Sequence, residues 1–240
     1  MEEQAIDFFL FGATSDIAQR LFTDERDHFR KRIRRLILVQ RRNEVSPAYS
    51  GFETSLVIAD AANTRDFRAA LTDIVHRHAT RERKMEVFPT YGVFNTFGDM
   101  SKLRFAFSDD GLQINLNSRL QVIDAFKPFH ANTRFHLFGS LLGSFPYAGD
   151  YALSMWYVNQ LPRHPEYKDL DLRIYNLGGM KTGFWEHAKG PKNNPFVHRD
   201  IPVRWLRQRM ADEHRGTFDC YPTLVSRIAI ALARRGARLL

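Results

Sequence analysis

Hydrophobic and polar positions along the chain alternate between short apolar runs and longer stretches with an apolar residue every three or four positions. The short runs predict β-strands, and the helical spacing predicts amphipathic helices. Strands are expected at residues 6–11, 36–40, 55–59, 85–88, 134–138 and 172–176. Helices are expected at residues 17–31, 65–78, 114–126, 151–161 and 224–235.

Strands separated by helices indicate an α/β fold in which a parallel sheet is covered on both faces. Neither a linker rich in Pro, Gly or Ser nor a low-complexity run divides the 240 residues, so one domain spanning residues 1–240 is expected. Ligands of such folds bind beyond the carboxyl ends of the strands. The residues that follow each predicted strand are therefore the first candidates for a functional site.

The first predicted strand runs into Gly12-Ala13-Thr14-Ser15-Asp16-Ile17-Ala18, at the start of a predicted helix. A strand, a glycine turn and a helix N-terminus together form a binding site for nucleotide phosphates. The candidate contacts are Gly12, Thr14, Ser15, Asp16 and Ile17. An ordinary turn in which Ser15 or Asp16 caps the helix is the alternative, because one glycine of the usual three is present.

Arg41 and Arg42 follow the second predicted strand. An acidic residue there would bind the ribose 2′-hydroxyl of NAD, whereas an arginine pairs with the 2′-phosphate of NADP. NADP is therefore expected rather than NAD, unless both arginines only face solvent. Asp60 and Ala61 follow the third strand, where the carboxylate would accept a hydrogen bond from adenine or form a turn.

Composition and charge exclude several classes of protein. The single Cys220 excludes a disulfide framework and a cysteine-based zinc cluster, and no histidine pair has metal-ligand spacing, so no metal site is expected. No apolar run approaches the ~20 residues of a membrane span, and the acidic start Met1-Glu2-Glu3-Gln4 does not resemble a secretory signal. A cytoplasmic location is expected.

The formal net charge of +8 raises the question of nucleic acid binding. Basic residues gather in residues 30–42 and near the carboxyl end, without the interleaved aromatic residues that stack on single strands. A solvated basic helix face is expected instead. Hydrolase and P-loop functions are also disfavoured. The sequence contains neither the G-x-S-x-G nucleophile elbow of hydrolases nor the G-x-x-x-x-G-K-[ST] phosphate loop.

A serine and a tyrosine follow the fifth predicted strand. Ser140 comes directly after this strand, and Tyr151 opens the next predicted helix, with Ser154 in its first turn. At the carboxyl edge of a nucleotide-binding sheet, such hydroxyls can bind a carbonyl oxygen and give it a proton. With these residues the chain resembles the short-chain dehydrogenase/reductase family over residues 6–185.

The resemblance extends to other segments in the same order. Asn115 corresponds to the asparagine of the proton relay, and Gly92 to the glycine that ends the family's Asn-Asn-Ala-Gly segment. Leu177-Gly178-Gly179-Met180-Lys181-Thr182 resembles the loop that contacts the nicotinamide, which makes Gly178 and Thr182 cofactor contacts. The resemblance implies a Rossmann-type fold and reduction of a small carbonyl substrate with NADPH. Ser140 would orient the oxygen, Tyr151 would donate the proton and Asn115 would support the relay.

The chain departs from the family at one position of the site. Met155 stands where the family has a lysine, four residues after the tyrosine. A lysine there shares a helix face with the tyrosine and lowers its pKa, whereas methionine has no charge and no donor. Lys181 is a candidate replacement and Tyr147 an alternative acid. A nucleotide-binding regulator, redox sensor or assembly subunit without catalysis is therefore the alternative function.

Residues 185–218 lie where the family carries a substrate lid, and their mixture of proline, tryptophan and charged residues is typical of a loop-rich cover. Their basic residues would attract an anionic substrate, such as a nucleotide sugar or an acyl carrier. The family resemblance also implies a homodimer or homotetramer that pairs through the helices containing Ile114 and Tyr151.

Overall fold

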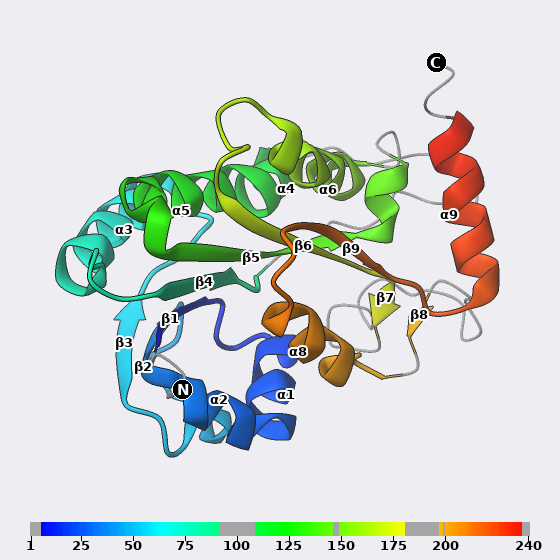
Figure 1. Cartoon of the computed structure of the whole chain (residues 1–240). Coiled ribbons are helices and arrows are strands. Elements are labelled where there is room, and N and C mark those ends of the chain that lie inside the picture. The colour runs from blue at the N-terminus through cyan, green and yellow to red at the C-terminus, as the bar shows by residue number, and fades with distance from the viewer. Residues whose placement is uncertain (1–5, 92–108, 146–148, 181–196, 199, 237–240) are drawn as a thin grey trace.

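One parallel sheet organises the protein. The computed structural model describes residues 6–91, 109–145, 149–180, 197–198 and 200–236. Seven strands lie in the order β3-β2-β1-β4-β5-β6-β9, and each neighbouring pair is parallel (Figure 1). Their bounds are β1 (Ile6–Phe11), β2 (Ile33–Gln40), β3 (Thr54–Ile58), β4 (Met85–Pro89), β5 (Thr133–Ser140), β6 (Asp171–Leu177) and β9 (Gly216–Cys220). A separate pair consists of β7 (Gly179–Met180) and β8 (Val197–His198).

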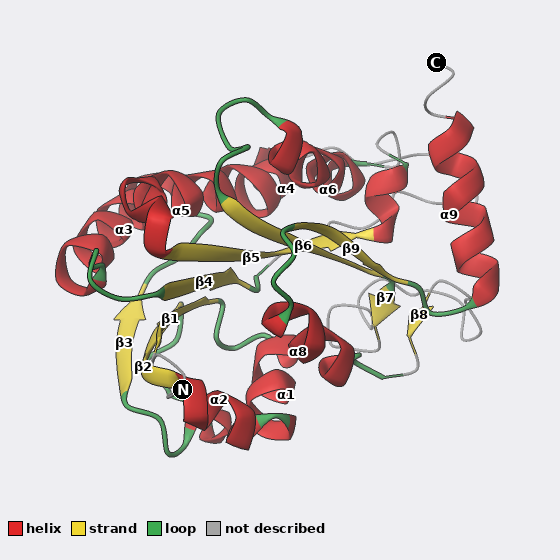
Figure 2. Ribbon diagram, viewed as in Figure 1, coloured by secondary structure: helices red, strands yellow, loops and turns green. Residues whose placement is uncertain are grey.

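Helices cover both faces of this sheet (Figure 2). One face carries α3 (Thr64–His78), α4 (Asp109–Leu112), α5 (Ser118–Phe126) and α6 (Asp150–Gln160). The other face carries α1 (Asp16–Asp24), α2 (Arg26–Arg32) and α8 (Val203–Ala211), while α9 (Leu224–Gly236) stands beyond the β9 edge. The expected doubly wound α/β fold of a single domain is confirmed.

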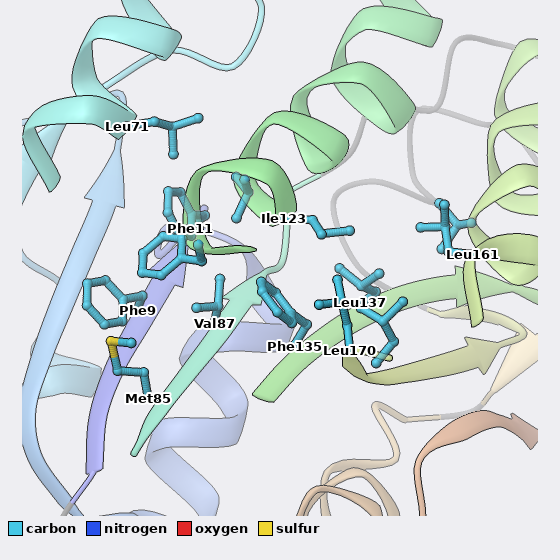
Figure 3. Packing of buried hydrophobic residues seen from close by; sticks show 14 of the residues in the cluster. Phe9, Phe11, Leu71, Met85, Val87, Ile123, Phe135, Leu137, Leu161 and Leu170 are labelled. Carbon is cyan, nitrogen blue, oxygen red and sulfur yellow. The ribbon is translucent and has the colours of Figure 1, made fainter. Parts of the chain in front are cut away.

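The central strands are apolar on both sides, because each of their faces is covered. Phe9 and Phe11 of β1 point toward α3 and α5, where they pack with Leu71 and Ile123 (Figure 3). The alternating positions Phe8 and Leu10 pack into the second cluster, against α1, α2 and α8. Burying a large apolar side chain contributes roughly 1.5–3 kcal/mol. The two clusters therefore fix the sheet between its helical layers.

Two elements differ from the pattern in the sequence. The helix expected at residues 17–31 is divided into α1 and α2, because Glu25 takes the non-helical angles φ −115° and ψ 26°. Strand β9 was not expected, since its sequence Gly-Thr-Phe-Asp-Cys has no regular apolar alternation. It forms by pairing with β6. The range 185–218, expected to be loop-rich, thus contains α8 and the first residues of β9.

The basic stretch at residues 30–42 is only partly solvated. Arg34 donates three hydrogen bonds to the fully buried Asp7 carboxylate, at 2.8, 3.0 and 3.0 Å, and Arg35 adds one at 3.1 Å. Arg32 pairs with the buried Glu86 at 3.1 Å. The expectation of a solvated face is wrong for these three arginines, because buried carboxylates at the beginnings of β1 and β4 require charged partners.

None of the helices in the described part of the chain has the length and apolar character needed to cross a membrane.

Candidate functional site

Hydrogen bonds between strand ends bring the candidate residues to one edge of the sheet. The Gly12 N–H donates to Val39 at the end of β2 (2.7 Å), and the Thr90 N–H donates to Phe11 at the end of β1 (2.7 Å). Ser140, the last residue of β5, lies opposite Leu177 of β6. The residues after β1, β2, β4, β5 and β6 therefore share the carboxyl edge, where α/β sheets bind their ligands.

The glycine turn after β1 is tightly packed. Gly12 has a φ of +79°, and a Cβ on it would lie 2.8 Å from the Tyr91 backbone nitrogen, so a larger residue would be strained as well as crowded. Thr90 Oγ1 lies 2.9 Å from the Gly12 carbonyl oxygen and accepts a hydrogen bond from Ser15 at 2.9 Å. The two residues that follow β4 therefore fix the turn.

The helix that follows this turn begins with a side-chain cap. Ser15 is the N-cap of α1 and accepts a hydrogen bond from the Ala18 N–H at 3.2 Å. Thr14 and Asp16 are exposed, and Ile17 is half-buried. The capping role weighed for Ser15 is confirmed, while nucleotide contacts at these residues stay a prediction.

Arg41 and Arg42 are exposed directly after β2. Neither guanidinium forms an ion pair with a residue that the structure describes. The buried Gln40 amide donates to the carbonyl oxygens of Arg42 and Glu44 at 2.8 and 2.7 Å, and so holds the loop that carries both arginines. Two guanidinium groups are thus available to an anion beside the glycine turn.

Asp60 and Ala61 follow β3, next to the same loop, because the Ala59 N–H donates to the Gln40 carbonyl at 3.0 Å. The Asp60 carboxylate accepts a hydrogen bond from the Ala62 N–H at 3.0 Å, which is the turn role weighed for it. Both residues are half-buried. A contact to adenine stays a prediction.

The serine and the tyrosine meet at the carboxyl edge. Ser140 ends β5, and α6 begins at Asp150, whose carboxylate accepts the Tyr151 N–H at 2.6 Å. The side chains of Ser140 and Tyr151 lie near each other and interact. Burial raises the pKa of Tyr151, while the charge of Arg119 and the Ser140 hydroxyl act in the opposite direction. Tyr151 is therefore protonated at neutral pH and can donate a proton.

Asn115 is fully buried in a π-helical turn (Gln113–Asn117) that leads into α5 and packs against α6. Such turns often occur at functional sites, because the extra residue redirects the side chains of the helix. The predicted helix at 114–126 is therefore divided between this turn and α5. Its placement beside α6 brings Asn115 to the same region as Tyr151.

Met155 lies one turn after Tyr151 on α6 and is fully buried. Its Sδ is 3.7 Å from Nη1 of Arg119, a buried residue of α5. The Arg119 guanidinium also donates to the carbonyl oxygens of Phe138 and Tyr91, at 2.5 and 2.9 Å. The sequence reasoning missed Arg119, although an arginine on the apolar face shared with Val122 and Ile123 was the available signal.

Several predicted positions lie outside the described residues: Gly92, Tyr147, Lys181, Thr182, and residues 185–196 and 199 of the expected lid. Gly178 is described and buried directly after β6. Among the described residues, no group of three or more His, Cys, Asp or Glu side chains is placed to hold a metal ion.

Comparisons with known proteins give structural neighbours alone. No family model and no curated protein matches the chain. A short-chain dehydrogenase from Burkholderia cenocepacia in complex with NADP is 15% identical with a TM-score of 0.67, covering 100% of this chain and 97% of its own.

Two further structural neighbours match this chain over a similar share of its length. A short-chain dehydrogenase from Sphingobium yanoikuyae in complex with NADPH is 16% identical, with a TM-score of 0.67, and covers 98% of this chain and 95% of its own. One from Streptomyces avermitilis is 14% identical, with a TM-score of 0.69, and covers 98% and 94%. The chain therefore has the fold of the short-chain dehydrogenases.

Proposed function

We propose that the protein is an oxidoreductase of the short-chain dehydrogenase/reductase type, which reduces a carbonyl substrate with NADPH. The observation that carries the proposal is the proximity of the Ser140 and Tyr151 hydroxyls at the carboxyl edge of the sheet. Two neighbouring hydroxyls there can receive a carbonyl oxygen together. The NADP and NADPH complexes of two structural neighbours are consistent with this cofactor.

The residues along the edge fit a dinucleotide phosphate. The N-terminus of α1 supplies N–H groups and a positive helix end for the pyrophosphate. The exposed Arg41 and Arg42 supply charge for a 2′-phosphate, and Arg41 is the preferred partner. When bound, NADPH would supply the hydride. Asp60 and Ala61 would border the adenine, and Gly12 and Gly178 would allow close approach.

The side chains at the edge divide the proton chemistry between them. The Ser140 hydroxyl donates a hydrogen bond to the substrate oxygen and orients it, while Tyr151 passes its proton to that oxygen. Asn115, buried in the adjoining π-helical turn, supports the relay. Because burial keeps Tyr151 protonated, reduction is favoured over oxidation, which needs the tyrosinate as a base.

Met155 favours a second candidate function. A buried methionine four residues after Tyr151 offers no charge and no hydrogen-bond donor to the site. A protein that binds the nucleotide without turnover, as a regulator, redox sensor or assembly subunit, would tolerate that change. We rank it second, because the proximity of the Ser140 and Tyr151 hydroxyls has no evident use in a protein that only binds.

An anionic substrate has limited support. Of the basic residues in the range 185–218, Arg207 pairs with Glu25 at 2.8 Å and Arg209 with Asp212 at 3.1 Å. Arg204 is exposed on α8. We propose a small carbonyl or alcohol as the substrate, with a homodimer or homotetramer as the assembly.

Two measurements test the proposal. Calorimetric titration with NADPH and NADH should give tighter binding of NADPH, and failure to bind either nucleotide would contradict both candidate functions. A screen of carbonyl compounds, followed by NADPH absorbance, tests catalysis. Tyr151→Phe should reduce turnover by about 10²–10⁴-fold while nucleotide affinity is kept. Turnover that survives this substitution would mean that another group is the acid.

A further inference from the structure

Arg119 is a buried cation with neutral neighbours. Its guanidinium contacts two carbonyl oxygens and the Met155 sulfur, and no carboxylate of the described residues forms an ion pair with it. Removing a charge from water costs several kcal/mol unless its surroundings compensate. The position of this arginine therefore requires a reason.

One reason is structural. The ladder between β4 and β5 ends at Val87 and Phe135, and the strands continue beyond it to Pro89 and Ser140. Arg119 spans this opening, because it donates to the carbonyl of Phe138 on β5 and to that of Tyr91 after β4. Neutral donors would also satisfy carbonyl oxygens, so the bridge by itself does not explain the charge.

The second reason is Tyr151. Arg119 lies four residues after Asn115, and its Nη1 is 3.7 Å from the sulfur of Met155, which shares a helix face with Tyr151. Two phenols, Tyr151 and Tyr91, interact electrostatically with the guanidinium. Burial lowers the pKa of Arg119, and these two phenols raise it. Burial raises the pKa of both tyrosines, and the same charge acts in the opposite direction.

We infer that the Arg119 guanidinium is the positive charge that positions and electrostatically supports Tyr151, in the region where a lysine at position 155 would otherwise act. Arg119 reaches this region from α5, the neighbouring helix, whereas a lysine at 155 would reach it from the helix of Tyr151. Arg119 is thus a positioning residue, and its importance for turnover rests on the proposed function.

The effect of the Arg119 charge on the phenol at position 151 can be measured directly. Tyr151 is replaced with a fluorinated tyrosine, whose phenol titrates nearer neutral pH, and its ¹⁹F signal is followed against pH. Two variants are compared: Arg119→Gln removes the charge, and Arg119→Lys keeps it. Both variants lose the paired hydrogen bonds by which the guanidinium joins the Phe138 and Tyr91 carbonyl oxygens. We expect Arg119→Gln to raise the phenol pKa by about one unit or more, the effect of losing a nearby opposite charge, and Arg119→Lys to keep most of the native value.

Controls separate charge from folding. The same probe at Tyr157, on the exposed side of α6, should not respond to Arg119→Gln. Arg173→Gln removes another fully buried arginine that contacts backbone carbonyls, on the opposite face of the sheet, and should leave the phenol at 151 unchanged. If Arg119→Gln does not fold, the double variant R119Q/M155K returns the charge from α6 and should titrate within about half a unit of the native arrangement.

Equal pKa values in the Gln and Lys variants would overturn the inference and leave Arg119 a bridge between strands. For the double variant, a pKa about one unit or more above the native one would do the same. The titration uses neither nucleotide nor substrate, so it is independent of the proposed function. Retained carbonyl reduction without this coupling would remove the inference alone, whereas coupling without nucleotide binding would remove the proposed function alone.

Discussion

Placing a lysine at position 155 should destabilise this protein, although the family it resembles has a lysine there. In the variant Met155→Lys, the new ammonium would face the Arg119 guanidinium, because the native sulfur lies 3.7 Å from Nη1. Two like charges about 4 Å apart repel by about 4 kcal/mol at an effective dielectric constant of about 20. For a chain of this size, that corresponds to a melting temperature lower by roughly 8–16 °C.

The pH dependence of this loss has a definite sign. The introduced lysine can escape the repulsion by losing its proton, which costs about 4.6 kcal/mol at pH 7 and about 1.9 kcal/mol at pH 9 from its ordinary pKa of about 10.4. Its folded pKa is therefore lower than its unfolded pKa, and the unfolded state binds more protons. Stability consequently rises with pH, and the deficit should shrink from about 4 to about 2 kcal/mol between pH 7 and pH 9.

The assay is a double-mutant cycle, measured by urea unfolding at both pH values. M155K is compared in the native and the Arg119→Gln backgrounds, and Met155→Leu serves as an uncharged control that should cost less than about 1.5 kcal/mol. We expect M155K to be several kcal/mol less harmful when Arg119 is absent. Costs that agree in the two backgrounds within about 0.5 kcal/mol would refute the reasoning, because independent sites add in this way.

Four other predictions concern separate parts of the molecule. Gly12→Ala should lower the free energy of unfolding by about 2–4 kcal/mol, because it adds the strain of a positive φ to a clash with the Tyr91 backbone; a melting temperature within 1 °C of native would contradict this. Arg41→Ala should weaken NADPH binding about 10-fold or more in calorimetry and leave NADH unchanged, and equal losses would show that it does not bind the 2′-phosphate. Ser140→Ala should lower turnover about 10²-fold or more while keeping nucleotide affinity, and an unchanged rate would exclude Ser140 from carbonyl binding. Burial raises the pKa of Glu86, but the adjacent His136 and nearby arginines outweigh it and hold that pKa at about 2; on the order of 3 kcal/mol of stability should be lost as pH falls from about 4.5 to about 2, and Glu86→Gln should not show this loss.

Local sequence determined much of the fold. Continuous apolar runs such as Phe8 to Phe11 can be stable only when both faces of a strand are covered, so they imply a parallel sheet between helical layers. The glycine turn and the N-cap at Ser15 could also be predicted from the sequence, because each depends on the conformation of a few consecutive residues. The hydrophobic pattern could not reveal β9. This strand lies at the edge of the sheet and pairs only with β6, so it needs no regular alternation of apolar residues.

Only the tertiary structure decided which charged residues, far apart in the sequence, interact with one another. The sequence contains Asp7, Glu86 and a basic stretch, but the register of β1 with β2 makes Arg34 and Arg35 partners of a buried carboxylate. Likewise, the sequence established that Met155 stands where a lysine would be expected. The packing of α5 against the ends of β4 and β5 brings Arg119 to that place, because electrostatic interaction depends on distance through space and not on separation along the chain.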